Sequence, residues 1–101
     1  MAYTHPMVEQ LMVDGKKFEG LLFPIGKTAP LIIIKGSKGF LACGYIDIAT
    51  ADQLNEAAAI VRGVNTFFDM THASVQKVSP EAERIGVKVG MTGREALAIL
   101  A

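Results

Sequence analysis

The segment Gly-Phe-Leu-Ala-Cys-Gly-Tyr-Ile-Asp, residues 39–47, decides how the rest of the sequence is interpreted. It combines a continuous apolar run with the only cysteine of the chain, Cys43. An apolar run of this length, preceded by a glycine and followed by a capping signal, predicts a buried strand over Phe40 to Asp47. We therefore expect this strand to lie in the interior of a sheet.

Three further strands are predicted before this segment. Val8 to Val13 and Phe18 to Phe23 are apolar-rich and are separated by Asp14 and Gly15, a dipeptide that suits a tight hairpin turn. Leu31 to Lys35 contains three consecutive isoleucines, whose branched β-carbons favour a strand covered on both faces. This third strand is expected to be central.

The segment after Asp47 predicts a helix, a strand and a short helix. Thr50 and Gln53 have the spacing of a capping box, which predicts a helix from about Ala51 to Ala59. Residues 60–64 resemble a fifth strand. Thr66 with Asp69 indicates a short helix that carries Phe67, Phe68 and Met70.

Two stronger helix starts follow. Ser79, Pro80 and Glu81 predict a helix that ends at Gly86, because proline fits a first helical turn and acids oppose the positive end of the helix dipole. Thr92 with Glu95 is a second capping box, leading into a C-terminal helix. Residues 1–101 are thus expected to form one α+β domain with two layers. Its sheet is mixed but mostly antiparallel, with four or five strands, and three or four helices lie mainly on one face.

The charge balance argues against one class of partner. The 101 residues include ten Lys plus Arg and ten Asp plus Glu, so the formal net charge is zero. Nucleic-acid binding draws its affinity from clustered positive charge, so no nucleic-acid partner is expected. The longest apolar runs are far shorter than the roughly 20 residues that cross a bilayer, so no membrane span is expected.

Cysteine content and size predict a location and an assembly state. A single cysteine forms no internal disulfide, and residues 1–6 lack the pattern of a signal peptide, so we expect a cytoplasmic protein. Half of the residues are hydrophobic, and a chain of this size leaves much apolar surface uncovered. This predicts a homo-oligomer.

Two segments resemble the YunC-like family, a small domain of unknown function in bacteria and archaea. One is residues 39–47 with Cys43 and Gly44. The other is Ile85 to Leu97, which reads Ile-Gly-Val-Lys-Val-Gly-Met-Thr-Gly-Arg-Glu-Ala-Leu. The likeness covers most of the chain and extends to the order of its features. It implies a compact α+β domain and supplies no chemistry.

Cys43 and Asp47 are candidate catalytic residues. Cys43 would act as a nucleophile or redox thiol if a nearby cation lowered its pKa, and otherwise it packs in the core. Asp47 would act as a base or ligand anchor at a strand end, or would favour the start of the following helix. Along an extended strand they lie roughly 13 Å apart, which excludes a directly bonded pair.

The segment from Lys88 to Arg94 is a candidate anion site. Thr92 and Gly93 open the last helix, where backbone donors can point outward, and Arg94 and Lys88 add positive charge. Alternatively, Glu95 completes the cap and neutralises the site. No spacing specifies a cofactor, and His5, His72 and Cys43 do not form a metal-binding pattern.

These residues support three hypotheses, and whether any reaction is catalysed stays open. The first is a small-molecule or anion pocket where the Cys43 strand meets the Gly90 to Arg94 turn. The second is an assembly or interaction module without a ligand, in which an apolar sheet face is a subunit interface. The third is a thiol-dependent enzyme that uses Cys43.

Overall fold

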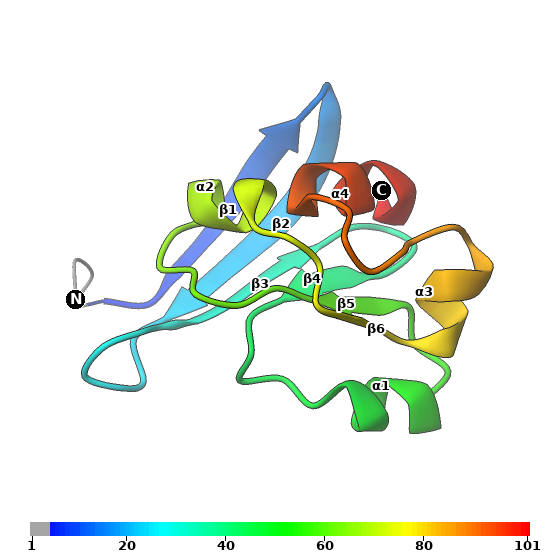
Figure 1. Cartoon of the computed structure of the whole chain (residues 1–101). Helices are drawn as coiled ribbons and strands as arrows, with labels where there is room; N and C mark the ends of the chain where they lie inside the picture. The colour runs from blue at the N-terminus through cyan, green and yellow to red at the C-terminus, as the bar shows by residue number, and fades with distance from the viewer. Residues whose placement is uncertain (1–4) are drawn as a thin grey trace.

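The computed structural model describes residues 5–101, which form a single six-stranded mixed sheet and four helices (Figure 1). The strands are β1 (Met7–Val13), β2 (Lys16–Phe23), β3 (Leu31–Lys35), β4 (Phe40–Ala42), β5 (Ala58–Ile60) and β6 (Lys77–Val78). The helices are α1 (Ile48–Gln53), α2 (Phe67–His72), α3 (Pro80–Arg84) and α4 (Gly93–Leu100). The predicted α+β class is confirmed, with six strands in place of four or five. Residues 1–4, part of the stretch searched for a signal peptide, lie outside the described residues.

The hairpin of β1 and β2 forms as the sequence predicts. Asp14 and Gly15 have φ angles of 52° and 80°, the left-handed region that a two-residue hairpin turn requires. Val13 pairs with Lys16 across this turn. Asparagine, aspartate and glycine tolerate this backbone region best, so the dipeptide fixes the register of the whole hairpin.

The order of strands in the sheet is the order along the chain, β1 to β6. Neighbouring strands are antiparallel except for β4 and β5, which are parallel and are joined through α1. β4 therefore lies in the interior, as expected, and β3 is covered on both edges. The predicted bounds of β3 match those observed.

The strand that begins at Phe40 is shorter than predicted. It ends at Ala42, and the N–H of Ile46 donates to the carbonyl oxygen of Cys43 at 3.2 Å, which closes a turn. Asp47, and not Thr50, caps α1, because its Oδ1 accepts from the N–H of Ala49 at 3.0 Å. The strand prediction failed because the apolar run continues through the turn.

The first helix also ends earlier than predicted, at Gln53 and not near Ala59. Residues 57–59 fall within the predicted helix, and alanine favours helices. In the structure Ala58 and Ala59 are fully buried and pair with β4. Here the burial of these small side chains outweighs the helix propensity of alanine. The sequence does not predict β6, because a strand of two residues is too short to show an alternation of apolar and polar side chains.

The remaining helix starts are confirmed. The side chains of Thr66, Ser79 and Thr92 each accept a hydrogen bond from a backbone N–H in the first turn of α2, α3 and α4. Thr92 and Glu95 form the complete capping box. Within residues 5–101, no helix has the length and apolar character needed to cross a bilayer.

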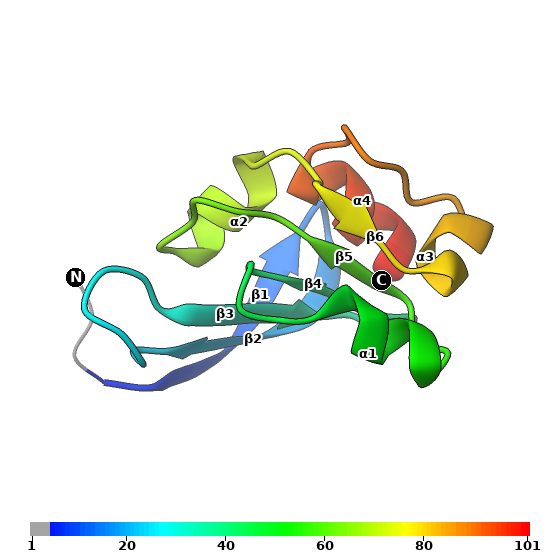
Figure 2. The ribbon, with the colours of Figure 1, turned by 60° about the horizontal axis from the view of Figure 1, so that its bottom comes forward.

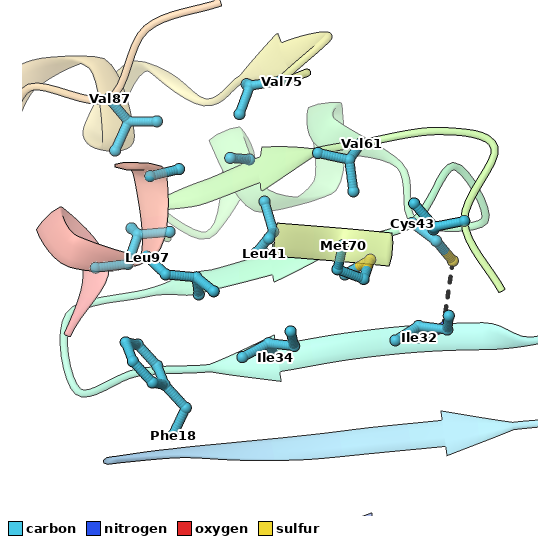
Figure 3. Close-up of a cluster of buried hydrophobic side chains, with 14 of the residues drawn as sticks. Phe18, Ile32, Ile34, Leu41, Cys43, Val61, Met70, Val75, Val87 and Leu97 are labelled. Atoms are coloured by element: carbon cyan, nitrogen blue, oxygen red, sulfur yellow. Dashed lines mark hydrogen bonds between the residues drawn. The ribbon is translucent and has the colours of Figure 1, made fainter. Parts of the chain in front are cut away.

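The main core lies between the sheet and a helical layer of α2, α3 and α4 (Figure 2). Figure 3 shows Phe18, Ile34 and Leu41 of the sheet on the same side as Met70 and Leu97 of the helices. All five are buried, and each contributes roughly 1.5–3 kcal/mol on transfer from water. α1 lies on the opposite side of β4 and β5 from α2 and α4 (Figure 1).

Candidate functional site

A hollow of about 470 Å³ opens where β4 and β5 end. Because these two strands are parallel, their carboxyl ends lie at the same edge of the sheet. The segments that leave them, residues 43–45 and 62–65, form two walls of the hollow, and residues 28–30, which precede β3, form a third. Carboxyl ends of parallel strands are where open sheets with helices gather their ligands.

Cys43 lies in the wall of this hollow with 4% of its surface exposed. Its Sγ accepts a hydrogen bond from the N–H of Ile32 at 3.4 Å, drawn as the dashed line in Figure 3. The thiol also donates to the carbonyl oxygen of Pro30 at 3.9 Å. The sulfur therefore connects the end of β4 to the start of β3. Of the two roles considered for Cys43, this is the packing role.

Gly44 and Tyr45 form the turn that follows Cys43, and both are exposed. Their backbone N–H groups have no backbone hydrogen-bond partner among residues 5–101, and the same is true of Gly63 in the facing wall. The Tyr45 hydroxyl donates to the carbonyl oxygen of Ala29 at 3.4 Å. Two walls of the hollow thus present unpaired backbone donors.

Arg62 is the charged residue of the hollow. It is exposed, and it takes part in none of the three salt bridges formed within residues 5–101. The other two arginines of the chain, Arg84 and Arg94, are paired with Glu81 and Asp14. Arg62 is thus the arginine of the chain that forms no salt bridge within residues 5–101.

Asp47 does not belong to this hollow. Its carboxylate caps α1, which is the commoner of the two roles considered for it. No lining residue of the hollow comes from α1. The structure therefore uses Asp47 for local helix formation and leaves Cys43 without an acidic partner from this position.

Three backbone donors at the turn before α4, those of Thr92, Gly93 and Glu95, are already occupied. The N–H of Gly93 donates to the carbonyl oxygen of Ala73 at 2.8 Å. The N–H of Glu95 donates to Thr92 Oγ1 at 3.2 Å, and the N–H of Thr92 donates to Glu95 Oε1 at 2.9 Å. The bonds that Thr92 donates to Glu95 Oε1 from its N–H and from its hydroxyl hold the pKa of the Glu95 carboxyl below its usual value.

Arg94 is occupied as well. Its Nε donates to Asp14 Oδ2 at 2.8 Å, and a second guanidinium nitrogen binds the other carboxylate oxygen. This fork depresses the pKa of the Asp14 carboxyl. Lys88 is exposed and contributes its backbone carbonyl to a turn with the N–H of Met91. The arrangement gives the Lys88 to Arg94 segment a structural role.

The expected meeting of the two glycine-marked segments does not occur. Arg94 lines a second hollow, of about 390 Å³, together with Leu11 of β1 and Phe67 of α2, whereas Cys43 lines the first. The prediction of a single shared pocket was therefore wrong, because the Thr92 turn packs against α2 and the segment that follows α2. Arg62 and Gly63 face Cys43 instead. The signal that could have predicted their place is that Arg62 directly follows β5, a strand that is connected to β4 through the helix α1.

Three comparisons place the chain among proteins without an assigned activity. A family model described as a domain of unknown function, DUF1805, matches residues 42–100. The uncharacterized protein YunC of Bacillus subtilis is 32% identical over 91 residues, which are 86% of this chain and 89% of that relative. A crystal structure of a protein of unknown function from Thermoplasma acidophilum, TA1206, has a TM-score of 0.89, 32% identity and full coverage of both chains. The chain belongs to this YunC-like DUF1805 family of bacteria and archaea, as its two glycine-marked segments predicted.

Proposed function

We propose that this domain binds a small anionic molecule in the hollow at the carboxyl ends of β4 and β5. The observation that carries the proposal is Arg62, an exposed guanidinium that lines the hollow and has no salt-bridge partner within residues 5–101. A guanidinium offers paired donors that match the geometry of a carboxylate or phosphate.

The size and the lining of the hollow support the same conclusion. A volume of about 470 Å³ lies within the range of roughly 300–1,000 Å³ typical of small-molecule sites. The backbone N–H groups of Gly44, Tyr45 and Gly63 have no backbone partner within residues 5–101, and backbone donors from successive turn residues can make anion-binding concavities. Thr28 and Asn65 add neutral polar groups that can orient a ligand.

A titration followed by two-dimensional amide NMR tests the proposal, with inorganic phosphate and citrate as probes. Saturable shifts of the Gly44, Tyr45 and Gly63 signals are expected, with dissociation constants in the millimolar range or below. A charge-assisted hydrogen bond is worth roughly 1.5–3 kcal/mol, so Arg62→Ala should weaken binding by about ten- to a hundredfold. Arg84→Ala, which removes an exposed and paired arginine, is the matched control and should change nothing.

Three outcomes would contradict the proposal. One is the absence of saturable shifts with either probe. The second is binding that survives Arg62→Ala and is lost in Arg84→Ala, which would place the anion on α3. The third is shifts confined to the signals of Thr92, Gly93 and Arg94, which would return the site to the turn before α4.

A thiol-dependent reaction has less support from the same hollow. Cys43 lines the hollow, but its sulfur is held between the N–H of Ile32 and the carbonyl of Pro30 and is almost fully covered. Reactive cysteines lie in partly exposed positions beside a cation. The proposed ligand therefore contacts the Cys43 wall without a covalent step.

A cytoplasmic location is part of the proposal. Its support is Cys43, a buried free thiol, because unpaired cysteines are typical of compartments that keep thiols reduced. Cell fractionation with detection of the untagged protein tests this, and recovery in a secreted or membrane fraction would contradict it.

A further inference from the structure

The buried part of the lining of the hollow at β4 and β5 is apolar. It consists of Pro30, Cys43 and Val64, none of which has a side-chain nitrogen or oxygen. The thiol of Cys43 already donates to the carbonyl oxygen of Pro30. A hydroxyl or phosphoryl group placed against these residues would lose its hydrogen bonds to water and find no side-chain partner. The part of a ligand that contacts them is therefore expected to be apolar.

The polar part of the lining is exposed and carries a single charge. Thr28 and Asn65 are neutral, and Arg62 is the one charged side chain of the hollow within residues 5–101. One guanidinium balances one negative charge, so a group with two or three charges would be held with part of its charge unbalanced. A carboxylate matches Arg62 both in charge and in planar shape.

The side chain of Arg62 lies against the turn that follows β4. A β-carbon added to Gly44 would approach Arg62 Cγ to 3.5 Å, so the stem of the arginine lies close to this turn. An arginine stem is apolar, and only the guanidinium at its end has to be solvated or paired. The stem therefore adds apolar surface to the hollow next to the positive charge.

The ring of Tyr45 adds a further apolar surface to the lining. Tyr45 is 53% exposed, and its hydroxyl donates to the carbonyl oxygen of Ala29 at 3.4 Å. A tyrosine whose hydroxyl is bound leaves the carbon atoms of its ring as contact surface. The hollow thus combines one cation with apolar surfaces in three walls.

We infer that the anion bound in this hollow is a monocarboxylate with a short apolar chain. The inference rests on the function proposed above and specifies its ligand. The carboxylate pairs with Arg62, and the chain contacts Pro30, Val64 and Tyr45. Sugars and nucleotides suit the hollow less well, because they bring many hydroxyl groups or several charges to a lining whose buried part is apolar.

Amide NMR titrations with acetate, butanoate and hexanoate test the chain of the ligand. Full burial of one methylene group raises affinity by about fourfold, so hexanoate should bind at least about tenfold tighter than acetate even if its chain is only partly buried. The signals of Gly44, Tyr45 and Gly63 should shift. Equal affinity for the three acids overturns the inference.

Two probes with the same chain test the charged group. Hexanamide is neutral and should bind at least about tenfold more weakly than hexanoate, because it cannot form a charge-assisted pair with Arg62. Hexyl phosphate carries about −1.5 to −2 charges at neutral pH and should bind no tighter than hexanoate. Hexanamide that binds as tightly as hexanoate, or hexyl phosphate that binds more tightly, overturns the inference.

Tyr45→Ala tests the apolar surface without a change of charge. Because Tyr45 is exposed, this variant should fold like the wild type, and its preference for hexanoate over acetate should fall by at least about threefold. Phe68→Ala is the matched control, since Phe68 is an exposed aromatic residue that lines the second hollow. It should keep the wild-type preference. An unchanged preference in Tyr45→Ala, or a loss in Phe68→Ala alone, overturns the inference.

The same titrations separate this inference from the function on which it rests. If phosphate and citrate bind at Arg62 but affinity does not rise from acetate to hexanoate, the anion site stands and the monocarboxylate is wrong. If phosphate, citrate and all three acids fail to produce saturable shifts, both the site and its ligand are wrong.

Discussion

Two turns of this domain look alike in sequence and differ in what surrounds them. Gly93 follows Thr92 in a closed turn, where a β-carbon added to Gly93 would overlap the carbonyl oxygen of Met70. Gly44 follows Cys43 in an open turn, where an added β-carbon would meet only Arg62 Cγ, at 3.5 Å. The first glycine is needed for close packing of backbones, and the second leaves space. The structural role of a glycine in a turn therefore depends on the atoms that pack around it.

The largest expected effect is at the closed turn. Gly93→Ala should lower the free energy of unfolding by about 3 kcal/mol or more, because the methyl group forces α4 away from α2. Urea denaturation followed by circular dichroism measures this. A loss smaller than about 0.5 kcal/mol would show that the turn has room, and the distinction between the two turns would then fail.

Cys43, in the wall of the open hollow, should show an intermediate effect. Cys43→Ala removes a buried sulfur that binds β3 and should cost about 1–2 kcal/mol in the same denaturation experiment. In the wild type, alkylation by iodoacetamide should proceed only through opening of the structure, and its rate should rise with added urea. Rapid alkylation of the fully folded protein would instead favour the thiol-dependent reaction.

Gly44 should tolerate substitution. It has no positive φ, and an added methyl group makes an ordinary contact with Arg62, so Gly44→Ala should change the free energy of unfolding by less than about 0.5 kcal/mol. Binding of phosphate should weaken, because the methyl group narrows the hollow. Large destabilisation would mean that this turn is as closely packed as the turn at Gly93.

The smallest expected effect concerns the ion pair of Asp14 with Arg94, next to the closed turn. The hydrogen bond from Arg94 lowers the pKa of Asp14, so the stabilisation is present above about pH 4 and is lost as the pH falls through the lower folded value. Asp14→Asn keeps a residue that suits the left-handed turn and removes this dependence. Melting temperatures from pH 6 to pH 2.5 should therefore fall less steeply in Asp14→Asn than in the wild type. Parallel curves for the two proteins would contradict this contribution.

Local signals predicted most of the fold. The isoleucines of β3, the Asp14-Gly15 turn and the caps at Ser79 and Thr92 each act through neighbours in the chain, so the sequence alone shows them. The errors arose where tertiary packing decides. Ala58 and Ala59 favour a helix by propensity, but they are fully buried and pair with β4 as part of the strand β5.

The candidate site was harder to predict, because its residues meet only through sheet topology. Cys43 and Arg62 line the same hollow because β4 and β5 are parallel. The spacing of these residues in the sequence does not reveal that the two strands pair. Arg94 carries the same charge as Arg62, but a carboxylate 80 positions earlier already binds it. Sequence alone cannot distinguish an occupied arginine from an available one.

The contacts between the first hairpin and the last helix have a consequence for the order of folding. Arg94 binds Asp14, and Lys16 Nζ donates to the carbonyl oxygen of Ala98, a separation of 82 residues. Leu97 and Leu100 of α4 are also fully buried in the main core. The main core is therefore closed only when α4 docks on the first hairpin. Contacts between residues so far apart in the sequence form late and slowly, so the docking of α4 is expected to limit the folding rate of this domain.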